Sequence, residues 1–163
     1  MPDAVQSFED YRGLIENGPA LPIRITFIPN FPELLREGEG SAVDAIVRNS
    51  VDYLALVDTG ASHTCVDDTL AQELQLPKVS EGNVAGVNSV ETVPIYWAHI
   101  YIDILKMGIF GFVFGVNLRK NGQDFDALLG RHFLRDIKMT YDGCLGRVEF
   151  DKYLPIYESA SDE

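Results

Sequence analysis

A carboxylate followed by a hydroxyl group and a glycine is the part of this sequence best suited to chemistry. The residues are Asp58, Thr59 and Gly60, with Ala61 and Ser62 after them and a run of apolar residues before them. An aspartate can take up and release protons during hydrolysis. A glycine lets another backbone approach closely, and a hydroxyl can hydrogen-bond where a backbone group cannot. These residue types also form plain turns, so the segment alone indicates either a catalytic loop or a turn.

A second apolar run that leads into a glycine lies farther along the chain. It contains Leu128, Leu129 and Gly130, and Arg131 follows directly. Between the two runs, residues 79–93 contain glycines and turn-forming polar residues, with few large apolar side chains. That composition predicts a hairpin that protrudes from the protein.

Together, these segments resemble the retropepsin-like aspartic protease family. In that family an apolar-Asp-Thr-Gly-Ala segment carries the catalytic acid, and a later apolar-apolar-Gly segment packs behind it. The same segments occur here in the same order, and the resemblance extends over residues 22–150. It implies a closed acid-protease-like β-barrel with one lobe per chain, and an aspartic endopeptidase that needs neither a metal nor a cofactor.

The resemblance also implies roles for the residues of the first segment. Asp58 is the expected catalytic residue, and Thr59 is expected to bond across a two-fold axis to its own copy. Gly60 would let the substrate backbone run close to the acids, while Ala61 and Ser62 would line the floor of the site.

The expected chemistry requires two carboxyl groups, because one takes a proton from the attacking water while the other gives a proton to the substrate carbonyl. Two carboxylates so close together share a proton. Pepsin-like enzymes carry two lobes in one longer chain, whereas this chain has one motif. We therefore expect a homodimer in which each copy supplies Asp58. The expected substrate is an extended peptide or unfolded protein, cut between apolar side chains as the family implies.

The hairpin of residues 79–93 corresponds to the flap that closes over an extended peptide in the family. The flap candidates are Val84, Ala85, Gly86 and Val87. The residues expected to contact substrate from the walls are Leu56, Val84, Val87, Val90 and Leu129.

The sequence departs from the retroviral pattern in two places. Retroviral enzymes commonly have acids after Asp-Thr-Gly-Ala, one of which pairs with the later arginine, but Ser62 and His63 stand there in this chain. The alternative partners expected for Arg131 are Asp67, Asp68 and Asp136. The terminal strands that form the family's dimer sheet are not identifiable, and the nearest candidates are residues 147–150 and 153–157.

Many short strands and few helices are expected to position these residues, which is typical of an all-β barrel or sandwich. One helix is expected over residues 7–18 and another over 67–76, with a loop over 29–41. The predicted strands cover residues 22–28, 42–48, 53–57, 96–105, 110–114, 125–129, 137–141 and 147–150. The expected organisation is an N-terminal helical extension (1–20), a protease domain (21–152) and an acidic tail (153–163).

The composition limits the function classes. The chain has 163 residues, 46% of them hydrophobic, and 25 acidic against 13 basic residues give a net charge of −12. Such a charge disfavours nucleic acid and anionic membranes as partners. The acidic N-terminal segment lacks the apolar stretch of a secretion signal, so a cytoplasmic location is expected. Cys65 and Cys144 are expected to be free thiols.

Two other functions fit the same residues. The fold could serve as a catalytically inactive peptide-binding or dimerisation module, with Asp58 hydrogen-bonded across the interface. A metal-dependent hydrolase could use Asp58 with His63 or His132, although the histidines lack metal-ligand spacing. Cys65 lies near His63 but lacks a third group to orient the pair as nucleophile and base.

Overall fold

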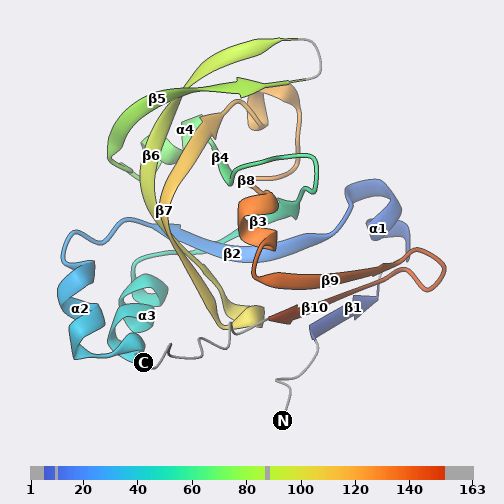
Figure 1. Ribbon diagram of the computed structural model, residues 1–163, viewed down its shortest axis with the longest axis horizontal. Helices are drawn as coiled ribbons and strands as arrows, with labels where there is room; N and C mark the ends of the chain where they lie inside the picture. Colours follow the sequence, from blue (N-terminus) through green and yellow to red (C-terminus); the bar gives the residue numbers. More distant parts are fainter. Residues whose placement is uncertain (1–5, 10, 87–88, 153–163) are drawn as a thin grey trace, which may run out of the picture.

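Strands predominate in the computed structural model, which describes residues 6–9, 11–86 and 89–152 (Figure 1). The strands are β1 (Gln6–Glu9), β2 (Ala20–Thr26), β3 (Asp52–Val57), β4 (Cys65–Asp67), β5 (Lys78–Ala85), β6 (Val90–Ile102), β7 (Met107–Val116), β8 (Ala127–Leu129), β9 (Ile137–Asp142) and β10 (Arg147–Lys152). The α-helices are α1 (Tyr11–Asn17), α2 (Phe31–Glu37), α3 (Glu39–Arg48), α4 (Asp68–Glu73) and α5 (Arg131–Leu134). Two 3₁₀ helices are η1 (Asp103–Leu105) and η2 (Arg119–Asn121).

Six strands form a closed barrel. The hydrogen-bonded order is β2, β3, β8, β4, β7 and β6, and β6 pairs back to β2. The pairs β3–β8 and β4–β7 are parallel, and the other pairs are antiparallel. The expected all-β, closed acid-protease-like barrel with one lobe per chain is therefore confirmed.

Alternating apolar residues bury one face of the barrel strands, as the sequence predicts. Ile23 and Ile25 of β2 are fully buried, and so is Ile100 of β6, which shares its inward face with Ala98 and Ile102. Burying an aliphatic side chain of this size contributes about 1.5–3 kcal/mol, so this inner face is the main stabilising feature of the barrel.

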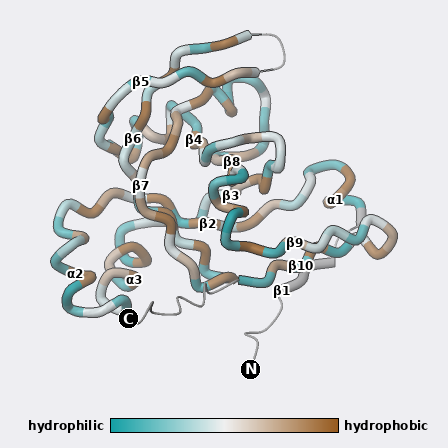
Figure 2. Tube along the Cα trace, viewed as in Figure 1, coloured by the Kyte–Doolittle hydropathy of each residue, from teal (hydrophilic) through white to brown (hydrophobic). Residues whose placement is uncertain are grey.

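The region between β2 and β3 differs from the expectation. The predicted loop over residues 29–41 contains α2, and the predicted strand over 42–48 is α3. The β-branched residues favoured a strand, but Ala42 and Ile46 lie four positions apart and bury the same helix face against the barrel. Figure 1 shows both helices on the outside of the barrel, and Figure 2 shows hydrophilic and hydrophobic residues mixed along them.

The N-terminal segment is not the single helix expected over residues 7–18. It forms β1 and then the shorter helix α1. Strand β1 pairs with β10, so local helical periodicity is overridden by a partner from the other end of the chain. Leu14 of α1 belongs to the main core. The division into an extension, a protease domain and a tail stays a prediction, and the tail lies outside the described residues.

A second, three-stranded sheet has the order β1, β10 and β9. Strand β10 is in its centre, so both of its edges are hydrogen-bonded within the chain. Residues 147–150 therefore have no free edge for pairing with a second chain, and their suggested role in a dimer sheet is wrong in this structure. Residues 153–157, the other candidate, lie outside the described residues. No helix in the part of the chain described here is long and apolar enough to cross a membrane.

His99 joins the helical region to the barrel. Its Nδ1 accepts a hydrogen bond from the Ile28 N–H at 3.1 Å, and its ring contacts Phe27, Phe31 and Phe110. Helices α2 and α3 cover this part of β6, since Phe31 contacts the His99 ring and Ala42 and Ile46 pack with Tyr101. Burial lowers the pKa of His99 to about 4, because the apolar surroundings disfavour the imidazolium.

The burial of His99 predicts a pH-dependent stability. In the unfolded chain the imidazole has a pKa of about 6.5, so between about pH 6.5 and 4 only the unfolded state gains this proton. The free energy of unfolding should therefore fall with a contribution of up to about 1.4 kcal/mol per pH unit. His99→Gln cannot titrate, and its oxygen can still accept from Ile28. Urea unfolding at pH 7.0, 5.5 and 4.5 measures the free energy of unfolding of both proteins. The advantage of wild type over the variant should become smaller as the pH is lowered. A constant gap would contradict the prediction.

Candidate active site

Asp58 stands at the point where β3 leaves the barrel. The apolar strand is paired in parallel with β8, and Val57 lies opposite Leu129. The Asp58 N–H donates to the Leu129 carbonyl at 3.0 Å, so the pairing extends to the acid itself. The two motifs singled out in the sequence are therefore adjacent strands, and the second motif fixes the position of the first.

A tight turn orients the carboxylate. The Gly60 N–H donates to Oδ1 of Asp58 at 2.8 Å, and the Ala61 N–H donates to the Asp58 carbonyl at 3.2 Å. Within the described residues, the other carboxylate oxygen has no hydrogen-bond partner. Asp58 is half-buried, whereas Thr59 and Gly60 are exposed. The carboxylate is thus held by one oxygen, and the other is available to water or to another chain.

Gly130 allows the second motif to lie directly against this loop. A Cβ atom at this position would stand 2.5 Å from the carbonyl oxygen of His63 and 2.7 Å from that of Ala61. Both are backbone atoms, so no side-chain rotation could relieve the overlap. The next two N–H groups, those of Arg131 and His132, donate to the Ala61 and Ser62 carbonyls at 2.8 and 3.1 Å.

Arg131 adds a third set of bonds to the loop. Its guanidinium donates to the carbonyls of Thr59 and Gly60, both at 2.9 Å, and to the Ser62 hydroxyl at 2.7 Å. The expectation that an aspartate would serve as its partner is wrong. The three candidates have other partners: Asp67 accepts from Leu70 and Arg119, Asp68 from Tyr96 and Gln72, and Asp136 from Arg135.

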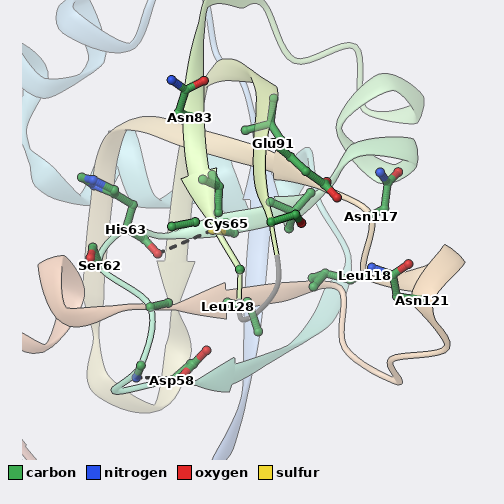
Figure 3. Close-up of a pocket in the computed structure, with 18 residues that line it drawn as sticks. Asp58, Ser62, His63, Cys65, Asn83, Glu91, Asn117, Leu118, Asn121 and Leu128 are labelled. Carbon is green, nitrogen blue, oxygen red and sulfur yellow. Dashed lines mark hydrogen bonds between the residues drawn. The ribbon is translucent and has the colours of Figure 1, made fainter.

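A cavity of about 690 Å³ opens above Asp58, between the loop and the β5–β6 hairpin (Figure 3). The predicted site residues that line it are Asp58, Gly60, Ala61, Ser62, Val84, Ala85, Gly86 and Leu128. The predicted hairpin is present, with Val84 opposite Glu91 and Ala85 opposite Val90. Val87 lies outside the described residues.

Several expected wall contacts are placed elsewhere. Leu129 is fully buried in the core, Val90 is largely exposed, and neither these two nor Leu56 lines the cavity. Apolar character alone did not distinguish the cavity face of a strand from the core face. Thr59, Gly130 and Arg131 support the loop without lining the cavity.

The sequence analysis missed a polar set of lining residues. These are Asn83, Ser89, Glu91, Asn117 and Asn121, joined by the apolar Val93, Val116 and Leu118. The position of Glu91 two residues before the buried Val93, on the same face of β6, was the one local signal for part of this set. Asn83 and Ser89 belong to the hairpin, and the remaining lining residues come from the end of β7 and from η2 and its neighbourhood, which only the tertiary fold brings to the site.

Cys65 and His63 do not form a catalytic pair. Cys65 is buried and its thiol lies 3.7 Å from the His63 carbonyl, not from the imidazole. Burial, and secondarily the negative charge of Asp58, raises the pKa of the thiol to about 11, so it stays protonated at neutral pH. The His63 ring stacks on Phe114 with a centroid separation of 4.7 Å. Both Cys65 and Cys144 are free.

No group of three or more His, Cys, Asp or Glu side chains is placed to hold a metal ion within residues 6–9, 11–86 and 89–152. His132, the other histidine considered for a metal site, faces a second cavity of about 610 Å³, which also borders His63 and the aromatic residues of β7. Asp58 does not line that second cavity.

The closed barrel, the Asp-Thr-Gly loop at its rim and the hairpin over the cavity define an aspartic-protease type of protein. Comparison of the sequence with protein-family models agrees, since the family described as gag-polyprotein putative aspartyl protease matches residues 43–136. The chain belongs to this family, and the resemblance to retropepsin-like proteases is confirmed.

Among solved structures, the chain is similar to the solution structure of Simian Foamy Virus (mac) protease. The two are 13% identical with a TM-score of 0.42, and the similarity covers 72% of this chain and 92% of that chain. A search of curated proteins found no match.

The contacts of Arg131 predict that it stabilises the loop as a hydrogen-bond donor and not merely as a charge. Arg131→Lys keeps the charge but cannot reach all three acceptors, so the free energy of unfolding should fall by about 1–2 kcal/mol. The amides of residues 59–62 should also exchange faster with solvent. Arg135→Lys is the matched control, because Arg135 pairs only with Asp136 at the surface, and it should change stability by less than about 0.5 kcal/mol. Equal effects of the two substitutions in urea unfolding would contradict this role.

Proposed function

We propose that this protein is an active aspartic endopeptidase that works as a homodimer. The observation that carries the proposal is the Asp58 carboxylate, which is fixed through one oxygen by the Gly60 N–H and faces an open cavity beneath a hairpin. Membership of an aspartyl protease family supports the class of reaction. The proposal adds that the site is catalytically competent and is completed by a second copy.

The chemistry explains why a second copy is required. In the proposed step, one Asp58 carboxylate removes a proton from a water molecule while the water oxygen bonds to the peptide carbonyl carbon. The protonated Asp58 of the partner copy gives its proton to the carbonyl oxygen. As the intermediate collapses, a proton passes to the departing amine and the C–N bond breaks. One chain offers only one such carboxyl in its cavity, because the other acid that lines it, Glu91, comes from the hairpin.

The exposed parts of the loop suit this assembly. Thr59 is exposed, and no hydrogen bond of its hydroxyl occurs within the described residues, so it is available to bond across the two-fold axis. Its carbonyl is held by Arg131, which restrains the backbone that carries the hydroxyl. The exposed Gly60 leaves room for a substrate backbone beside the acids.

An extended peptide is the substrate class that the cavity fits. The cavity lies between the loop and the hairpin, and among the described residues strand β5 pairs only with β6, so the other edge of β5 is open. Extended peptides bind such sites by backbone hydrogen bonds, with side chains in alternating pockets.

Replacement of the acid tests the proposal. Asp58→Asn should abolish cleavage of an unfolded protein between about pH 4 and 8 while leaving the fold and the dimer intact, and a chelator should not affect the wild type. Asp44→Asn, on the outer helix α3, removes an equal charge and should retain activity. A folded, dimeric wild type that cleaves nothing would instead favour the inactive peptide-binding module.

Mixing the two proteins tests the shared site. If chains exchange freely and each site needs both acids, an equal amount of Asp58→Asn should reduce the activity per wild-type chain to about half. Addition of Asp44→Asn should cause no such loss. Sedimentation across the same concentrations gives the fraction of dimer. A monomer that cleaves peptides, or activity unaffected by Asp58→Asn chains, would refute the homodimeric mechanism.

A further inference from the structure

Glu91 lies on the face of the hairpin that points into the cavity. In β6 it is two residues before Val93, which is buried and lines the same cavity, and it pairs across the hairpin with Val84. Side chains two apart on a strand share a face, so a carboxylate stands between two valines on the underside of the hairpin. Figure 3 shows Glu91 directed toward Asn117, on the hairpin side of the cavity, with Asp58 on the opposite side.

The charge of Glu91 is not compensated by any partner in the described part of the chain. Within the described residues its carboxylate has no hydrogen bond or ion pair, and neither Lys nor Arg lines the cavity. Glu81, the other acid of the hairpin strands, pairs with Lys78 at 2.6 Å. Arg119 follows the lining residue Leu118, but its guanidinium is engaged by Asp126, Glu73 and Asp67.

The remaining polar lining side chains are mostly neutral. Asn83, Asn117 and Asn121 can hydrogen-bond to a ligand but cannot neutralise a carboxylate. A long basic side chain matches this surface, because its alkyl stem can lie on Val84 and Val93 while its charged end reaches the acid. The net charge of −12 also favours the approach of basic over acidic peptides.

We propose that Glu91 is a specificity-determining residue that selects substrates with a lysine or arginine side chain close to the scissile bond. This inference rests on the proposed endopeptidase function and adds a substrate class to it: extended, basic peptides with apolar neighbours. Because the protein is proposed to be a symmetric dimer, each site would contain two copies of Glu91, one on either side of the cut bond.

Matched peptides measure this selection. A peptide library first locates the position at which Lys or Arg is enriched, and kcat/KM is then compared for peptides with lysine or norleucine there. Norleucine keeps the alkyl stem and lacks the ammonium group. Wild type should prefer lysine, and Glu91→Gln should lower the lysine-to-norleucine ratio by about fivefold, as expected for a partly exposed ion pair. Glu91→Lys should favour a glutamate peptide instead.

The ratio is insensitive to a general loss of activity, so it separates selection from damage to the site. Glu37→Gln removes the same charge from α2, a helix that contributes no residue to the cavity lining, and it should leave the ratio unchanged. A wild type with Asp58-dependent cleavage but no preference for lysine would overturn the inference. So would a preference that survives in Glu91→Gln.

Failure of the proposed function would be recognised separately. If no peptide is cut, fluorescence anisotropy can measure binding of the lysine and norleucine peptides to Asp58→Asn, with and without Glu91→Gln. A lysine preference that depends on Glu91 would support the inference even for a binding module. Equal binding of both peptides would overturn it.

Discussion

The close contact between Gly130 and the Asp58 loop is the constraint on which the rest of the site depends. The parallel pairing of β3 with β8 brings the two apolar runs side by side, and the absence of a side chain at Gly130 lets its backbone lie against the carbonyls of Ala61 and His63. Two backbone bonds and three bonds from Arg131 then fix the loop. The barrel therefore positions the backbone of the acid, and the Gly60 N–H then orients its carboxylate.

Arg131 shows how one chemical requirement can be met in different ways. The retroviral pattern leads to the expectation of an acid–arginine pair, whereas here a neutral set of two carbonyls and a hydroxyl accepts from the guanidinium. A planar guanidinium can reach several acceptors at once. The loop thereby avoids a further carboxylate near Asp58, which would raise the electrostatic cost of ionising a shared pair of acids.

The sequence predicted the structure correctly where its apolar residues repeat with the period of only one secondary structure. Strand β2 and the inner face of β6 follow from alternating apolar and polar residues, and the loop at Asp58 follows from its Asp-Thr-Gly pattern. The prediction was wrong for residues 42–48, where both a strand and a helix fit the apolar pattern. Their β-branched residues favour a strand, whereas Ala42 and Ile46 are spaced as on one face of a helix, and the segment forms α3. Long-range pairing, such as that of β1 with β10, and the cavity residues of η2 have no local signal.

The proposed pair of Asp58 carboxyls and the buried His99 respond to acid in opposite ways. A pair of Asp58 carboxyls works while it shares one proton, a state that acid favours over the doubly ionised one. Acid also protonates His99 in the unfolded chain but not in the folded protein, where Phe27, Phe31 and the Ile28 N–H hold the neutral imidazole in place. The free energy of unfolding therefore falls as the pH is lowered. Acid therefore lowers the stability of the region that holds α2 and α3, although it would favour the shared proton of the proposed pair of carboxyls. The working range of the protein is expected to lie above the pKa of about 4 of His99, where the folded state keeps the neutral imidazole that anchors the helices.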